Sequence, residues 1–171
     1  MFEHDASSIV WGVSPTMFMV GGVCHVISIA FPHWLATPEA HLGLWNYCVT
    51  AKADGEHEEC VDITHALNAV DHSWFRAVQG LEIAATVFVL TGLVTGLMRV
   101  NLSNNIWQIA CGLSAVVAGV MSVSGTIVFA KNYTSIRDQM LSWAFVFNAV
   151  SGPLCFLAGP ILIVDAILHK S

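Results

Sequence analysis

Cysteine and histidine are the residue types in this 171-residue chain with the most reactive side chains, at five and eight copies. Cys48 and Cys60 lie in a polar stretch, whereas Cys24, Cys111 and Cys155 lie in long apolar runs. A thiol pair in a small polar loop can form a disulfide, which persists in oxidising compartments. A Cys-x-x-Cys redox pair is missing, and we expect the other three cysteines to be small core residues.

Enzymatic and metal chemistry find little support in the remaining residues. Three histidines near acidic residues could hold zinc, but they lack the paired spacing of zinc ligands: His57, His65 and His72. A haem site in a helical membrane protein would need histidines on facing spans, and only His25 lies within one. There is no Ser/His/Asp arrangement and no phosphate-binding loop. We therefore expect no enzyme, no metal and no cofactor.

The stretch between Pro32 and Arg76 is strongly acidic, with seven carboxylates and one lysine. Five of these carboxylates form a candidate acidic outer face: Asp54, Glu56, Glu58, Glu59 and Asp62. Their potential would concentrate cations within about a Debye length, roughly 8 Å at physiological salt. If the loop lines a path between cells, that path should favour cations. The alternative interpretation is a solvated face that resists aggregation, and the EF-hand calcium pattern is absent.

The elements that position these residues are long apolar segments, since 56% of residues are hydrophobic and only 11% are charged. Runs without a charged residue exceed the ~20 residues that a helix needs to cross a bilayer. We predict one four-span domain over residues 1–171, with helices at 9–31, 77–98, 106–129 and 142–166. The loops are then 32–76 and 130–141. A net charge of -6 without a basic run argues against nucleic-acid binding.

The orientation in the membrane depends on two signals that disagree. Four of the six basic residues lie on the side of the larger loops, which by the positive-inside rule places those loops in the cytosol. A disulfide between Cys48 and Cys60 requires the opposite, and we give it more weight. We therefore expect both termini to be cytosolic. Five tryptophans mark the span ends as headgroup-level anchors: Trp11 and Trp107 on the terminal side, and Trp34, Trp74 and Trp143 on the loop side.

The first loop contains a predicted hairpin. Residues 43–50 and the stretch from Cys60 are rich in strand-forming types, and Ala53-Asp54-Gly55 can form a three-residue turn. This turn sets Lys52 opposite Glu56 and hence Cys48 opposite Cys60. A disulfide there would stabilise the fold by roughly 3 kcal/mol. Residues from His65 have helical spacing and predict a short interfacial helix.

Two further sites follow from depth in the membrane and from a sequon. His25 and Glu82 each lie about six residues from the loop-side end of a span, so both sit near 9 Å below the boundary at about 1.5 Å per residue. Such groups need partners, and we expect a structural intramembrane pair. The alternatives are separate bonds to Ser, Thr or backbone carbonyl groups, or access of Glu82 to the outer surface through water. Asn132 begins a glycosylation sequon close to the membrane, where we expect low occupancy.

The order and spacing of seven residues resemble the signature of the claudin superfamily: Trp34, Gly43, Leu44, Trp45, Cys48, Cys60 and Arg76. This superfamily includes peripheral myelin, epithelial membrane and lens fibre membrane proteins and channel gamma subunits. The resemblance implies an all-α membrane protein, a left-handed four-helix bundle with a small extracellular antiparallel β-sheet. It also implies cytosolic termini and a Cys48–Cys60 disulfide.

The expected function is contact at the plasma membrane. The chain ends at 167–171 without the longer tail and terminal Val that junctional claudins use to bind scaffolds, so we expect no scaffold-binding motif. We expect adhesion or membrane organisation through the sheet, with the lipid bilayer and further copies of the chain as partners. The alternative is an auxiliary subunit of an ion channel or receptor, with a pore-forming subunit as partner.

Overall fold

Four long helices dominate the structure, a computed structural model that describes residues 2–50, 58–63, 73–102, 104–133 and 140–168, without the side chains of 2–11 and 50. The helices are α1 (Phe2–Ala30), α3 (Ser73–Leu102), α4 (Asn105–Asn132) and α5 (Trp143–Leu168). Each contains a segment long and apolar enough to cross a membrane. The helices include the predicted spans, except that residues 31 and 142 lie one position outside α1 and α5. At the other ends the helices are longer than predicted.

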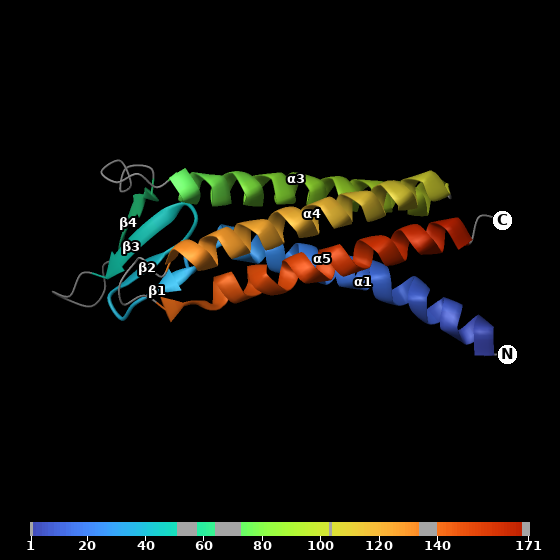
Figure 1. The fold of residues 1–171 in the computed structure, drawn as a ribbon, viewed down its shortest axis with the longest axis horizontal. Helices are drawn as coiled ribbons and strands as arrows, with labels where there is room; N and C mark the ends of the chain where they lie inside the picture. The colour runs from blue at the N-terminus through green and yellow to red at the C-terminus, as the bar shows by residue number, and fades with distance from the viewer. Residues whose placement is uncertain (1, 51–57, 64–72, 103, 134–139, 169–171) are drawn as a thin grey trace.

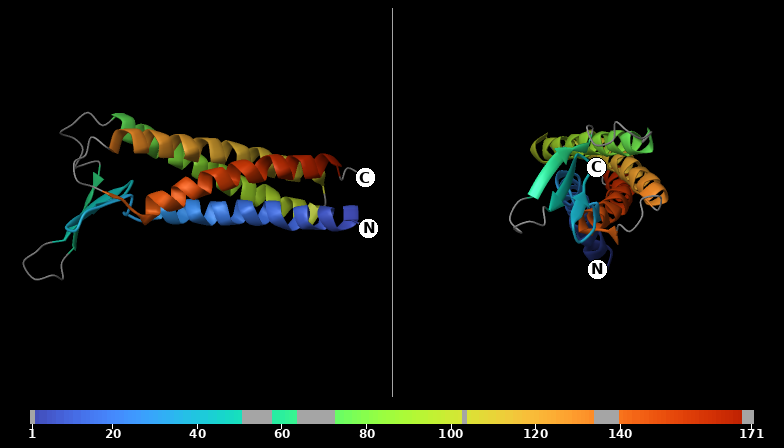
Figure 2. Two further views of the ribbon diagram at one scale, coloured as in Figure 1. Left: turned by 60° about the horizontal axis from the view of Figure 1, so that its bottom comes forward. Right: turned by 90° about the vertical axis from the view of Figure 1, so that its left-hand side faces the viewer.

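The helices form an elongated bundle with a sheet at one end and both chain termini at the other (Figure 1). Among the described residues, α3 packs along α4, α4 along α5, and α5 along α1, whereas α1 and α3 meet at few points. Figure 2 shows the sheet projecting beyond the helix ends. The expected fold class, four membrane-length helices with a small antiparallel sheet, is confirmed.

Within the described residues, the sheet has five strands in the order β4-β3-β2-β1-β5, all antiparallel to their neighbours. The strands are β1 (Leu35–Ala36), β2 (Ala40–Leu42), β3 (Asn46–Thr50), β4 (Glu58–Asp62) and β5 (Met140–Leu141). The two predicted strands correspond to β3 and β4, each with shifted bounds, and β4 extends to Glu58. The predicted turn at 53–55 and the predicted helix from His65 lie outside the described residues.

The register gives the sheet two different faces. One cross-strand row is apolar throughout and passes from the buried Leu35 to the exposed edge: Leu141, Leu35, Leu42, Tyr47 and Val61. The other row carries the disulfide: Met140, Ala36, His41, Cys48 and Cys60. Because side chains alternate along a strand, neighbours two residues away share these faces. We call them the apolar face and the disulfide face.

An aromatic core fills the junction between the sheet and the bundle. It combines residues from the sheet region with residues of α3, α4 and α5: Trp34, Leu35, Leu44, Ile63, Phe75, Val78, Phe129, Ala144 and Phe145. The Trp34 ring meets the edges of Phe129 and Phe145 at centroid distances of 4.8 and 5.8 Å. The interpretation of Trp34 as a headgroup anchor is therefore wrong, because its side chain is fully buried.

Helices α4 and α5 approach each other through glycines. A Cβ on Gly112 would lie 2.8 Å from the Gly159 carbonyl oxygen, and one on Gly159 would lie 2.6 Å from the Gly112 carbonyl oxygen. Real Cβ atoms do not tolerate such distances, so only glycine allows the two backbones this approach. The helix α5 is continuous through Pro153 and Pro160, both on its exposed side.

Candidate functional site

Two signature tryptophans, Trp34 just before β1 and Trp45 just before β3, donate hydrogen bonds to the last carbonyls of helix α1. The last carbonyls of a helix have no partner within it. The indole Nε1 of Trp34 donates to the Ser28 carbonyl at 2.9 Å, and that of Trp45 donates to the Ile29 carbonyl at 2.7 Å. Both tryptophans therefore fasten the sheet region to α1 as well as filling space.

The signature Gly43 and Leu44 hold the same junction together. A Cβ on Gly43 would collide with the Pro32 backbone, so the chain passes too closely for any other residue. Leu44 is fully buried in the aromatic core, and its carbonyl accepts a hydrogen bond from Gln79 Nε2 at 2.6 Å. Arg76, the last signature residue, is exposed on the first turns of α3 and does not enter the core.

The predicted disulfide is confirmed. Cys48 and Cys60 are directly opposed on β3 and β4 and are bonded to each other. Cys48 is buried, whereas Cys60 is exposed at the edge strand. The other three cysteines are free; Cys111 and Cys155 are buried and Cys24 is half-buried. The bond therefore ties the outermost strand to the sheet.

The described members of the acidic outer face all lie on β4. Glu58, Glu59 and Asp62 are exposed, whereas Asp54 and Glu56 lie outside the described residues. Strand alternation separates them: Glu58 and Asp62 share the disulfide face, and Glu59 shares the apolar face. The acids therefore border both faces of the sheet edge.

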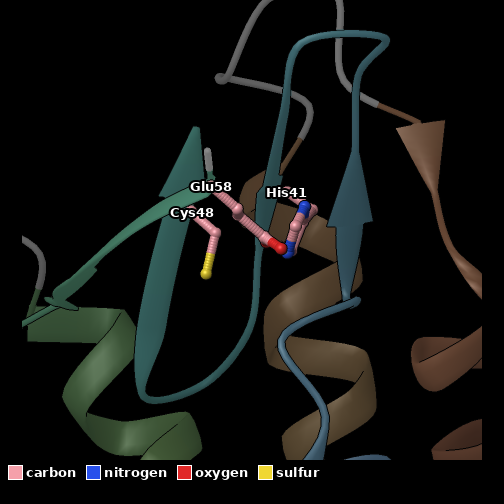
Figure 3. A group of neighbouring side chains, drawn as sticks. All are labelled: His41, Cys48 and Glu58. Carbon is pink, nitrogen blue, oxygen red and sulfur yellow. The ribbon is translucent and has the colours of Figure 1, made fainter. Parts of the chain in front are cut away.

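A small cluster on the disulfide face has the residue types of a metal site. The ligand atoms of His41, Cys48 and Glu58 lie within 4.8 Å of one another, and Figure 3 shows the His41 and Glu58 side chains meeting tip to tip. Their Nε2 and Oε1 atoms are 2.6 Å apart. Because the Cys48 sulfur is in the disulfide, it cannot supply a thiolate. His57, His65 and His72 lie outside the described residues.

His33 stacks on His41, with ring centroids 4.3 Å apart and planes inclined by 15°. Burial lowers the pKa of His33, and the nearby His41 lowers it further, while Glu58 acts in the opposite direction. The stack therefore disfavours a charged His33.

A buried polar layer crosses the bundle below the aromatic core. All four helices contribute to it: His25 from α1, Glu82 and Thr86 from α3, Ser122 and Thr126 from α4, and Asn148 and Ser151 from α5. His25 Nδ1 lies 3.7 Å from Glu82 Oε2, and both side chains are at most 1% exposed. The structure thus places the two ionisable groups on facing helix surfaces. Sequence reasoning missed Asn148, which lies between them.

Asn148 connects the two ionisable side chains to each other and to α4. Its Nδ2 donates to Glu82 Oε1 at 2.8 Å and to Thr126 Oγ1 at 3.0 Å. Its Oδ1 lies 3.3 Å from both His25 Nδ1 and Ser122 Oγ. The Glu82 carboxyl group packs directly against Gly125, where a Cβ would collide with it. Both donors and the acceptor of this amide are therefore used.

The sequon residue Asn132 is the last residue of α4. Its Nδ2, the atom that would carry a glycan, donates to the Val128 carbonyl at 2.8 Å. A helical backbone and an occupied amide both oppose glycosylation, which occurs on surface loops.

These features define a class: multi-pass membrane proteins with four spans and a disulfide-bonded sheet at one end of the bundle. The sequence profile of the PMP-22/EMP/MP20/Claudin family matches residues 10–162. The chain belongs to this family. It is similar to the lens fiber membrane intrinsic protein of Homo sapiens, with 24% identity over an alignment of 156 residues; the match covers 82% of this chain and 82% of the relative.

Proposed function

We propose that the chain acts in cell–cell contact, adhesion or membrane organisation through the apolar face of its sheet. The observation that carries this proposal is the apolar row, which leaves the core and ends at an exposed edge. Val61 is 48% exposed there, and its neighbour Val49 is 37% exposed on the same face. Exposed apolar patches rimmed by polar residues mark interaction sites.

The disulfide supports a location of the sheet outside the cell. Such bonds persist in oxidising surroundings, and this one joins the edge strand β4 to its neighbour β3. Both termini lie at the opposite end of the bundle and would then be cytosolic, in the plasma membrane (Figure 1). The proposed occupant of the apolar face is a second copy of the chain.

Contact between two labelled cell populations tests the proposal. Adherent cells that express the chain with a C-terminal epitope should concentrate it where two expressing cells meet, and less where one neighbour lacks it. The epitope should be detected only after permeabilisation. Val61→Asp should reduce the enrichment severalfold. Met140→Asp, at an exposed apolar residue in the row that carries the disulfide, is the matched control and should leave enrichment unchanged.

The outcomes separate the two functional classes. Equal enrichment of wild type and Val61→Asp, with both at the surface and disulfide-bonded, would overturn the role of the apolar face. Purification in mild detergent with a pore-forming chain in a fixed ratio would instead support an auxiliary subunit.

A further inference from the structure

The buried polar layer defines where its hydrogen atoms lie, because its chains of hydrogen bonds end at backbone carbonyls. A carbonyl oxygen can only accept, and a hydroxyl group has one hydrogen to donate. The donors and acceptors can therefore be assigned outward from these carbonyls.

The first chain of hydrogen bonds starts at the backbone carbonyl of Ser122 and determines the orientation of the Asn148 side-chain amide. The Thr126 hydroxyl donates to that carbonyl at 2.9 Å, so its oxygen must accept from Asn148 Nδ2. This orientation leaves Asn148 Oδ1 facing His25 Nδ1 at 3.3 Å. Because an amide oxygen only accepts, His25 Nδ1 must carry a hydrogen.

The second chain of hydrogen bonds starts at the backbone carbonyl of Glu82 and reaches Nε2 of His25. The Thr86 hydroxyl donates to that carbonyl at 2.8 Å, so its oxygen must accept from His25 Nε2 at 3.0 Å. Both nitrogens of His25 are then donors. An imidazole with two N–H groups is an imidazolium cation.

The Glu82 carboxyl group supplies the matching charge. Its Oε1 accepts from Asn148, whereas its Oε2 has no hydrogen-bond partner among the described residues and lies 3.7 Å from His25 Nδ1. A proton on Oε2 would have no acceptor, since neither imidazole nitrogen has a free lone pair. The described residues that α4 and α5 contribute to the layer are uncharged. A carboxylate beside an imidazolium makes the layer neutral overall, as burial requires.

We propose that His25 and Glu82 form a protonation site inside the bundle, holding one proton on the imidazole as an imidazolium–carboxylate pair. The pair joins α1 to α3, two helices that otherwise meet at few points. Loss of the proton would leave a buried carboxylate unpaired, and a second proton would leave a buried imidazolium unpaired. Either change would weaken the attachment of α1.

Infrared spectroscopy of the full chain in lipid nanodiscs at neutral pH tests the site. A protonated carboxyl group has a C=O stretch separate from that of a carboxylate, and it shifts in D₂O. The difference spectrum, wild type minus the Glu82→Gln variant, should show no band from a protonated carboxyl group. His25→Asn should gain a band that disappears in His25→Asn/Glu82→Gln, because Glu82 alone must be neutral. Glu59→Gln, an exposed carboxylate on β4, is the matched control and should not change the acid region.

An acid band in wild type that disappears in Glu82→Gln would overturn the proposal by placing the proton on the carboxyl group. Absence of a band in folded His25→Asn would also overturn it. A second measurement needs no substitution: ¹⁵N chemical shifts of histidine-labelled wild type. At about pH 8.5, two units above the usual histidine pKa, one imidazole should remain doubly protonated. A fully neutral histidine spectrum would contradict the proposal even if His25→Asn does not fold.

Discussion

The junction between the sheet and the bundle is filled with aromatic rings, whereas the buried polar layer is filled with hydroxyl, amide and ionisable groups. Both connect several helices, yet they depend on different properties of the side chains. The aromatic core depends on volume, because buried rings contribute mainly through contact area. The polar layer depends on the matching of donors and acceptors, because an unmatched buried polar group is costly. Truncation of a side chain should therefore reduce stability most in the aromatic core. A change of polarity at constant size should reduce it most in the polar layer.

The largest expected effect comes from truncation in the aromatic core. We expect Trp34→Ala to destabilise the chain by about 4 kcal/mol, since it removes a buried ring. The Ser28 carbonyl also loses its donor. Thermal unfolding in detergent measures the effect. Trp143→Ala, at a ring that is 40% exposed, should cost less than half as much; equal losses would contradict the assignment of Trp34 to the core.

The next effect concerns the covalent bond at the sheet edge. The double variant Cys48→Ser/Cys60→Ser should lose about 3 kcal/mol, the expected contribution of a disulfide that closes a loop of this length. A thiol reductant should lower the unfolding temperature of wild type and of Cys24→Ser, but not that of the double variant. Sensitivity of the double variant to the reductant would place the labile bond elsewhere.

A polarity change at Asn148 tests the polar layer directly. Asn148→Leu keeps a similar volume but removes the donor to Glu82 and the acceptor from His25, so we expect a loss of about 2 kcal/mol. Ser124→Ala removes only a hydroxyl that donates to the Val120 carbonyl of its own helix, and its effect should be below about 0.5 kcal/mol. If both variants unfold at the wild-type temperature, donor matching does not stabilise this layer.

The smallest expected effect is the pH dependence at the stacked histidines. Because the folded pKa of His33 is lowered, the unfolded chain binds more protons there at mildly acidic pH. The stability associated with a neutral His33 is therefore present above the usual histidine pKa of about 6.5 and is lost as the pH falls below it. His33→Gln should therefore lose less stability than wild type between neutral pH and pH of about 5. Identical profiles of the unfolding temperature would exclude His33 as the source.

Local signals in the sequence were sufficient for the spans and for one strand pair. Long apolar runs predict membrane helices, and the expectation of a turn at Ala53-Asp54-Gly55 predicts which residues face each other across β3 and β4. Both signals depend on nearby residues alone. The strands β1, β2 and β5 are two or three residues long and give no periodic signal, so their pairing could not be predicted.

The contacts that build the site depend on positions far apart in the chain. Trp34 and Trp45 have the amphipathic character of interface anchors, and only the folded chain places their indole groups at the α1 carbonyls. The predicted depth of His25 and Glu82 in the membrane indicated that both ionisable side chains need partners inside the bundle. Asn148 was missed because a single amide in an apolar run carries no charge to mark it, although its depth in α5 offered a signal.

The indole bonds also define a mechanical path through the molecule. Tension applied at β4 would pass through the disulfide into β3, and from Trp45, the residue before β3, into the last turn of α1. The load would reach this helix as shear across an N–H···O bond of 2.7 Å, alongside the peptide chain itself. If the sheet contacts a second copy of the chain, as proposed, part of the tension on β4 would therefore reach the end of α1 through this hydrogen bond.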